Sequence, residues 1–368
     1  MIKKLWCLGY ILVCNFICFS HIYAAPSINS VVGTVSSGQT ITITGLNFGT
    51  KATAAPLLWD NFESGVPGQV ITGKLPVVGS AWTTYTSGST VPVYDSAINK
   101  TGSTRSSRAD YYLKPDYDVC LTKNVNTTTG SELFFSYYWY YHKRSTRYAD
   151  NNKPWMVWGP GGLPMAYVGY GDPALGDGSS RYALQDNPYP SNSDLWGSSD
   201  LSNLNDKWVR IDVYLKQSAP NTANGVLQYW VNGVLDISKT SAITRTSNST
   251  WDTILLGGFI RQNQPIQIYI DDVYIDNTRA RIEIGDAATW TACKRKDIQR
   301  STSWSSNTIT AVVNQGSFTS SSGAYLSVID SNGSVNANGF PISFGQASTP
   351  SDITPPAKPS GVTIQIVQ

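Results

Sequence analysis

Carboxylates are the first candidates for chemistry in this sequence, because paired Asp and Glu side chains perform acid–base catalysis or bind metal ions. A retaining or inverting glycosidase needs two carboxylates that flank one bond. Beyond residue 24 the chain has three glutamates, far apart in sequence: Glu63, Glu132 and Glu283. The adjacent pair Asp271 and Asp272 lies in the alternating segment 266–276, which predicts a β-strand with the two carboxylates on opposite faces. The spacing argues against a glycosidase.

One histidine is the only candidate for a catalytic residue. His142 ends the alternating segment 131–143, and a period of two places Tyr138, Tyr140 and His142 on one strand face. A polysaccharide lyase uses Tyr or His as base and acid, and Arg or Gln neutralises the uronate. The alternative is that His142 is a polar residue at a strand end and the tyrosines belong to the core.

Aromatic residues offer a second kind of site, because exposed Trp and Tyr rings stack on the faces of sugar rings. Aromatic residues make up 12% of the chain. For each of them the alternative is a place in the hydrophobic core. The candidates for sugar binding lie in strand-like segments: Tyr138, Tyr140, Trp155, Trp158, Tyr167 and Trp230.

The first 24 residues predict export. Met1–Lys4 is basic, residues 5–19 are mostly apolar, and Ala24 is a small residue suited to cleavage, which together are typical of a bacterial secretory signal peptide. We therefore expect a periplasmic, extracellular or cell-surface protein. No later apolar segment is long enough to insert into a membrane.

The net charge bears on the possible binding partners, and the cysteine content bears on disulfide formation. Lys3 and Lys4 account for the formal charge of +2, so the remainder is neutral, which argues against nucleic acid as a partner. Cys120 and Cys293 remain after the signal segment. In an oxidising compartment they either form a disulfide or stay as two separately buried thiols.

The elements that position these residues are strands separated by Gly, Asn and Asp turns. The segment 39–49, Gln-Thr-Ile-Thr-Ile-Thr-Gly-Leu-Asn-Phe-Gly, resembles an IPT/TIG domain, an Ig-like fold. The expected second half follows only after residue 280, so residues 25–56 and 280–346 are interpreted as one discontinuous domain. Insertion at an exposed loop permits this. The alternative is an incomplete Ig domain, a sandwich and a second Ig domain.

The inserted region, 57–279, resembles the concanavalin A-like (LamG-like) jelly roll. The resemblance rests on Asp-Asn-Phe-Glu at 60–63, Trp-Val-Arg-Ile-Asp-Val-Tyr at 208–214, Tyr-Trp-Val-Asn-Gly at 229–233 and the segment 266–276. The predicted fold class is all-β: an Ig-like IPT/TIG sandwich with an inserted concanavalin-like jelly-roll sandwich. Residues 347–368 form a Pro-rich tail.

The jelly-roll resemblance also suggests a calcium site. First and last strands of such folds commonly lie side by side, and Ca²⁺ prefers carboxylate and carbonyl oxygens. Asp60, Glu63, Asp271 and Asp272 are then the candidate ligands of a structural calcium ion. The alternative is that hydrogen-bonded carboxylates hold the ends of the region together.

Taken together, these features favour a non-catalytic module that binds a carbohydrate or a cell-surface component. Two alternatives stay open: a lyase acting on an acidic polysaccharide, and a structural spacer on the cell surface.

Overall fold

The chain is built almost entirely from antiparallel strands, which confirms the predicted all-β class. The computed structural model describes residues 24–86, 88–111, 118–127, 131–143, 152–170, 179–185, 196–259, 266–318 and 323–348. The helical elements among them are single turns: η1 (Pro160–Gly162), α1 (Leu201–Leu204) and η3 (Trp290–Ala292). No helix in these ranges is long and apolar enough to cross a membrane.

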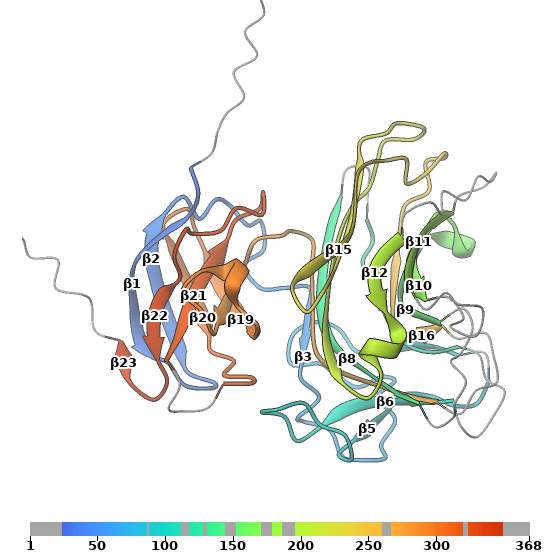
Figure 1. Cartoon of the computed structure of the whole chain (residues 1–368), viewed down its shortest axis with the longest axis horizontal. Helices are drawn as coiled ribbons and strands as arrows, with labels where there is room; N and C mark the ends of the chain where they lie inside the picture. Colours follow the sequence, from blue (N-terminus) through green and yellow to red (C-terminus); the bar gives the residue numbers. More distant parts are fainter. Residues whose placement is uncertain are drawn as a thin grey trace, which may run out of the picture.

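A small sandwich combines strands from both ends of the chain (Figure 1). Residues 40–44 of β2 pair with residues 308–312 of β20, so segments more than 250 positions apart share one sheet. The strand path is β22-β21-β18-β19-β20-β2-β1-β23. Its strands are β1 (Ser27–Thr34), β2 (Thr40–Leu46), β18 (Arg281–Gly285), β19 (Lys296–Trp304), β20 (Thr308–Val312), β21 (Gly323–Ile329), β22 (Phe340–Ser343) and β23 (Ala347–Ser348).

A large sandwich occupies the chain between these two segments and consists of two sheets. The seven-stranded sheet has the order β12-β11-β10-β9-β16-β7-β4, and its strands are β4 (Thr83–Thr86), β7 (Val119–Asn124), β9 (Asn152–Trp158), β10 (Met165–Tyr170), β11 (Ser179–Gln185), β12 (Trp196–Asp200) and β16 (Thr253–Phe259).

The eight-stranded sheet has the order β15-β14-β13-β8-β17-β6-β5, and β3 (Leu58–Asp60) pairs with β17. Asn232 and Gly233, both at positive φ, make the predicted turn of the β14–β15 hairpin. The strands of the eight-stranded sheet are β5 (Val93–Asp95), β6 (Ser106–Asp110), β8 (Glu132–Lys143), β13 (Trp208–Lys216), β14 (Gly225–Val231), β15 (Val234–Ala242) and β17 (Ile266–Asp276).

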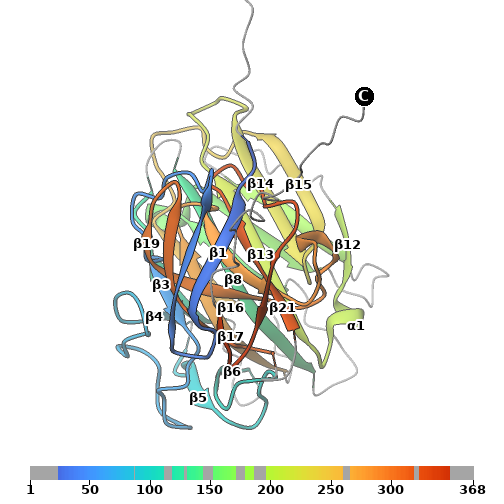
Figure 2. The ribbon, with the colours of Figure 1, turned by 90° about the vertical axis from the view of Figure 1, so that its left-hand side faces the viewer.

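Each sandwich has its own hydrophobic core. In β8 the alternation is regular, so Tyr137, Trp139 and Tyr141 enter the core between the two large sheets, and Tyr138 and Tyr140 leave it. A separate cluster fills the small sandwich and draws Ile41 and Ile43 from β2 and Ile309 and Ala311 from β20, among others. Figure 2 shows the small sandwich in front of the large one.

A β-bulge in β17 overturns the expectation that Asp271 and Asp272 face opposite ways. The register shifts between Asp271 and Tyr274, and Asp272 has a φ of +47°. The extra residue keeps Asp272 out of the core and lets Val273 and Ile275 enter it. Strict alternation would have buried the Asp272 carboxylate among apolar side chains, at a high desolvation cost.

Of the two alternatives left open for the cysteines, the structure has the separately buried thiols. Cys120 and Cys293 are free, buried thiols in different sandwiches. The Cys120 Sγ donates to the carbonyl of Gly258, and burial raises the pKa of Cys120 to about 12. The sequence shows two cysteines but carries no information on the distance between two sandwiches.

Candidate functional site

The eight-stranded sheet of the large sandwich has an outer face that is covered by the small sandwich. An apolar cluster joins them and contains Trp59, Phe134, Tyr214 and Tyr274 from the large sandwich and Ile298 from β19. We call this the covered face.

Ion pairs and hydrogen bonds reinforce the contact at the covered face. Arg210 donates to Asp212 on its own strand and, across the contact, to Glu283 at 2.7 Å and to the Lys296 carbonyl at 2.7 Å. Burial alone would raise the pKa of Glu283, but Arg210, Arg281 and Lys296 together hold it well below its usual range. The Lys51 ammonium, from the connector after β2, lies 2.7 Å from the Asp276 carboxylate.

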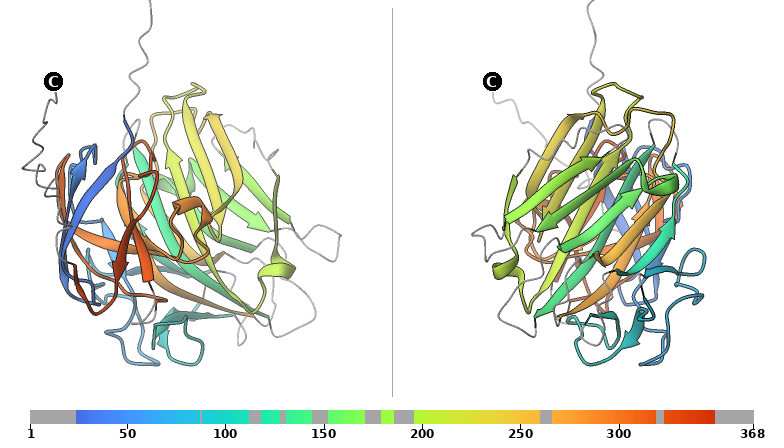
Figure 3. Two further views of the ribbon diagram at one scale, coloured as in Figure 1. Left: turned by 60° about the vertical axis from the view of Figure 1, so that its left-hand side comes forward. Right: turned by 90° about the vertical axis from the view of Figure 1, so that its right-hand side faces the viewer.

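The outer face of the seven-stranded sheet is different, because no other described element packs over it. In Figure 3 (right) this sheet faces the viewer and the small sandwich lies behind it. A compact apolar cluster covers its middle and consists of buried Cys120, Met156 and Leu255 with half-buried Trp158, Met165 and Tyr167. We call this the open face.

The aromatic rings of the open face are held by neighbours. The Tyr85 ring packs edge-on against Trp158, with 4.9 Å between ring centroids, and 40% of Tyr85 is exposed. The ammonium of Lys153 lies 4.9 Å from the centre of the Tyr167 ring. The face therefore offers a ligand aromatic rings that are held in place by their neighbours.

The six aromatic residues predicted to bind sugar do not share one surface. Trp158 and Tyr167 lie on the open face, whereas Trp155 is a core residue that is 1% exposed. Tyr138 and Trp230 lie on the covered face, where the Tyr138 hydroxyl donates to the Lys296 carbonyl. Tyr140 is on the same sheet face and packs against Trp208 and Tyr269. Residues 155 and 158 are three positions apart, so a regular strand places them on opposite faces.

His142 forms a close pair with an acidic side chain. Its Nδ1 lies 2.6 Å from Oδ1 of Asp206, and both side chains are partly exposed. A carboxylate accepts here, so Nδ1 carries the proton and Nε2 is the basic nitrogen. Arg108, two strands away, already pairs with Asp95 at 2.8 Å and Asp110 at 2.9 Å. Its charge is therefore neutralised before any uronate arrives.

The four predicted calcium ligands each have a separate partner. Asp60 accepts from the Trp82 indole at 2.7 Å, and burial raises its pKa from 3.8 to about 6. Glu63 accepts from Thr104 and the backbone of Arg105. Within the described ranges, no group of three or more His, Cys, Asp or Glu side chains is placed to hold a metal ion.

The two adjacent aspartates lie on the covered side. Asp272 pairs with Lys100 at 2.9 Å. Asp271 lies directly opposite Tyr138 and accepts from the backbone N–H of Asp272. Burial, and then the charge of Asp272, raise the pKa of Asp271 well above its usual range. The cation beside Asp272 in this structure is therefore the Lys100 ammonium.

Tyr85, Met156 and Met165 on the open face are not among the site residues predicted from the sequence. Period two in the segments 156–158 and 165–167 places each methionine beside the aromatic residue two positions later, which is a usable signal. The pairing of Arg210 with Glu283 has no such local signal, because it joins residues 73 positions apart.

Comparisons with known proteins reveal distant likenesses. No family model matches the chain, and no curated protein matches it. The endo-β-1,4-glucuronan lyase of the fungus Trichoderma reesei is 13% identical, with a TM-score of 0.44 over 58% of this chain and 96% of that one. The alginate lyase of Aplysia kurodai is 10% identical, with a TM-score of 0.38 over 50% and 87%.

A third similar structure is the binding domain of botulinum neurotoxin serotype G. It is 10% identical, with a TM-score of 0.40 over 74% of this chain and 72% of that one. At these values none of the three carries an argument about what this chain binds, which has to come from its own side chains.

Proposed function

We propose that the protein is an exported module that binds a carbohydrate, without catalysis, on the open face. The observation that carries the proposal is the set of rings on this face. Trp158, Tyr167 and Tyr85 are solvent-accessible, held by neighbours, and uncovered by any other described element. Apolar residues grouped on one exposed face mark a binding surface more often than scattered ones do.

The chemistry of the open face suits sugar rings. The C–H faces of a pyranose stack on Trp and Tyr, and the Lys153 ammonium beside Tyr167 helps to fix that ring. Glycosidic cleavage needs a positioned acid and base, and the described side chains of this face provide none. Binding is therefore better supported here than turnover.

Affinity electrophoresis tests the proposal directly. The full chain is run in native gels that contain laminarin, xyloglucan, alginate or polygalacturonate. We expect at least one polysaccharide to retard the wild-type protein, and Trp158→Ala to weaken that binding by about tenfold or more, as for a central aromatic contact.

The matched control is Trp208→Ala, which removes a half-buried tryptophan from the outer face of the other sheet. This variant should be retarded like the wild-type protein. Retardation that Trp158→Ala leaves unchanged, or the absence of retardation in all four gels, would refute the proposal.

A uronate lyase is the second candidate, and the pair of His142 with Asp206 is the observation that favours it. Such an enzyme would release an unsaturated sugar from alginate or polygalacturonate, which absorbs in the ultraviolet. The signal should vanish in His142→Ala if His142 is the base. Because Arg108 is already neutralised by two aspartates, we place this candidate behind binding.

A further inference from the structure

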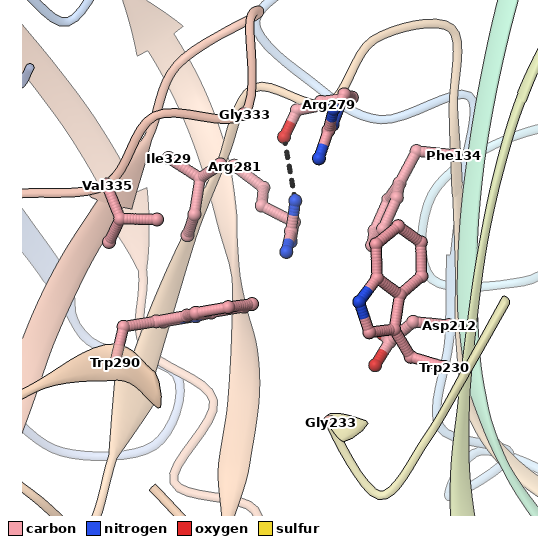
Figure 4. Close-up of a pocket in the computed structure, with 10 residues that line it drawn as sticks. All are labelled: Phe134, Asp212, Trp230, Gly233, Arg279, Arg281, Trp290, Ile329, Gly333 and Val335. Atoms are coloured by element: carbon pink, nitrogen blue, oxygen red, sulfur yellow. Dashed lines mark hydrogen bonds between the residues drawn. The ribbon is translucent and has the colours of Figure 1, made fainter. Parts of the chain in front are cut away.

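A pocket of about 220 Å³ lies between the two sandwiches, away from the open face (Figure 4). The large sandwich contributes Phe134, Asp212 and Trp230 to its wall, and the small sandwich contributes Arg281 and Trp290. Arg279, in the connector between the two sandwiches, completes it. A volume of this size admits one ring-sized ligand and excludes a chain of them.

Two tryptophans from different sandwiches line the pocket on opposite sides, as Figure 4 shows. Trp290 is held in place, because its indole N–H donates to Glu283 at 2.6 Å. The Lys296 ammonium lies 3.8 Å from the centre of the same ring. The pocket therefore has one aromatic wall, Trp290, that is fixed by its neighbours.

Positive charge exceeds negative charge in this pocket. Asp212 is already bonded by Arg210, and Glu283 is bonded by Arg210, Arg281 and Trp290. Both nearby carboxylates are thus used within the protein. The positive charge that remains for a ligand comes from Arg279 and Arg281, which keep N–H groups without a carboxylate partner.

The unused donors come from both arginines. The Arg281 Nε donates to Glu283 and its Nη1 donates to the Arg279 carbonyl, while its Nη2 has no partner among the described residues. The Arg279 guanidinium stacks 4.5 Å from the Tyr214 ring centre and, within the same ranges, makes no hydrogen bond or ion pair. Burial, and then the charge of Arg281, lower the pKa of Arg279. The more distant carboxylates of Glu132 and Asp330 raise that pKa, but by less. An anion in the pocket would relieve this repulsion.

We propose that this interdomain pocket binds a single hexuronate unit, with its carboxylate on Arg279 and Arg281 and its ring between Trp230 and Trp290. A guanidinium group pairs with a carboxylate through two parallel hydrogen bonds. An indole ring stacks on the C–H face of a pyranose. The site is separate from the open face, and its existence does not rest on the proposed function.

Isothermal titration calorimetry of the full chain tests the proposal with sodium glucuronate as the probe. Glucose supplies the ring without the charge, and acetate supplies the carboxylate without the ring. At equal ionic strength, glucuronate should bind at least about tenfold more tightly than either. A linear glucuronate trimer tests whether the ligand is a free sugar or the end of a chain. An affinity for the trimer comparable to that for glucuronate supports recognition of one terminal unit. Binding of the trimer but not of glucuronate overturns a single-ring site.

Arg279→Gln should weaken glucuronate binding by about tenfold. Arg295→Gln is the control, because Arg295 belongs to the small sandwich but pairs with Asp286 and is exposed. Thermal denaturation establishes that both variants fold. If Arg279→Gln fails to fold, Trp230→Phe should reduce the change in tryptophan fluorescence that glucuronate causes.

Two outcomes overturn the proposal: glucuronate that binds no better than glucose and acetate, or glucuronate affinity equal in Arg279→Gln and the wild-type protein. The open-face experiment is independent of both. Loss of polysaccharide retardation in Trp158→Ala with intact glucuronate binding would show that the two sites are distinct.

Discussion

Of the two outer faces of the large sandwich, one is covered by the small sandwich and the other is not, although both belong to antiparallel sheets of similar size. The covered face carries Phe134, Tyr214 and Tyr274, and the small sandwich packs on them. The open face carries Trp158 and Tyr167, and no described element packs on it. A group of apolar and aromatic side chains on one solvent-facing sheet marks a binding surface more often than scattered ones do, so the open face is the better candidate for a ligand.

Charge distinguishes the faces as clearly as packing does. The covered sheet and its contact hold buried acids that are paired with Arg210, Lys51 or Lys100. On the open face the ammonium of Lys153 lies above the Tyr167 ring. Fixed ion pairs specify one docking geometry between two sandwiches, whereas an apolar aromatic face suits a ligand that comes and goes.

The largest expected effect comes from breaking the covered face at its central cation. Arg210→Ala removes donors to Asp212, Glu283 and the Lys296 carbonyl, and leaves part of a buried carboxylate charge without a partner. We expect the free energy of unfolding to fall by about 3–5 kcal/mol. Denaturant unfolding followed by tryptophan fluorescence measures it.

A matched surface variant makes this comparison sharper. Arg295→Ala removes an arginine whose side chain is 48% exposed and whose pair with Asp286 spans 3.4 Å. Exposed pairs contribute about 0–1 kcal/mol. Equal losses in the two variants would show that the network around Arg210 does not hold the sandwiches together.

A smaller effect is expected from pH, through a buried acid of the covered sheet. The pKa of Asp60 is about 6 in the folded protein against 3.8 as the ordinary value. The folded state therefore holds a proton that the unfolded state has lost, so this group lowers stability as pH rises through that interval. Between about pH 4 and pH 7 the loss reaches about 3 kcal/mol.

Asp60→Asn isolates this contribution, since an amide can still accept from the Trp82 indole but does not titrate. The free energy of unfolding is measured for both proteins at several pH values. As pH rises, the variant should become more stable relative to the wild-type protein. A difference that is flat with pH would contradict the assigned burial cost.

Local patterns predicted the strands well and the long-range contacts poorly. Alternation in the segments 131–143 and 266–276 correctly identified β8 and β17, and Asn232-Gly233 identified a hairpin turn. The bulge at Asp272 was missed, because it depends on the cost of burying a carboxylate and on Lys100, which comes from another loop.

The binding residues were predicted only in part, for the same reason. Period two within one strand separates Trp155 from Trp158, but it cannot say which face of a sheet meets a second domain. Tyr138 looks like a sugar-binding residue until the small sandwich covers it, and Trp230 lines the pocket between the two sandwiches and not the open face. Which face stays open is decided by where residues 281–348 return to pair with β2.

Hydrogen–deuterium exchange on the full chain tests the central claim most directly. The probe is the polysaccharide, among the four in the gels, that retards the wild-type protein most. With saturating glucuronate in both samples to occupy the pocket between the sandwiches, we expect slower exchange within 152–158, 165–170 and 253–259, the strands beneath Trp158 and Tyr167. Exchange within 208–216 on the covered sheet should stay unchanged. Protection confined to 208–216 and the neighbouring strand 132–143 would contradict the assignment of binding to the open face.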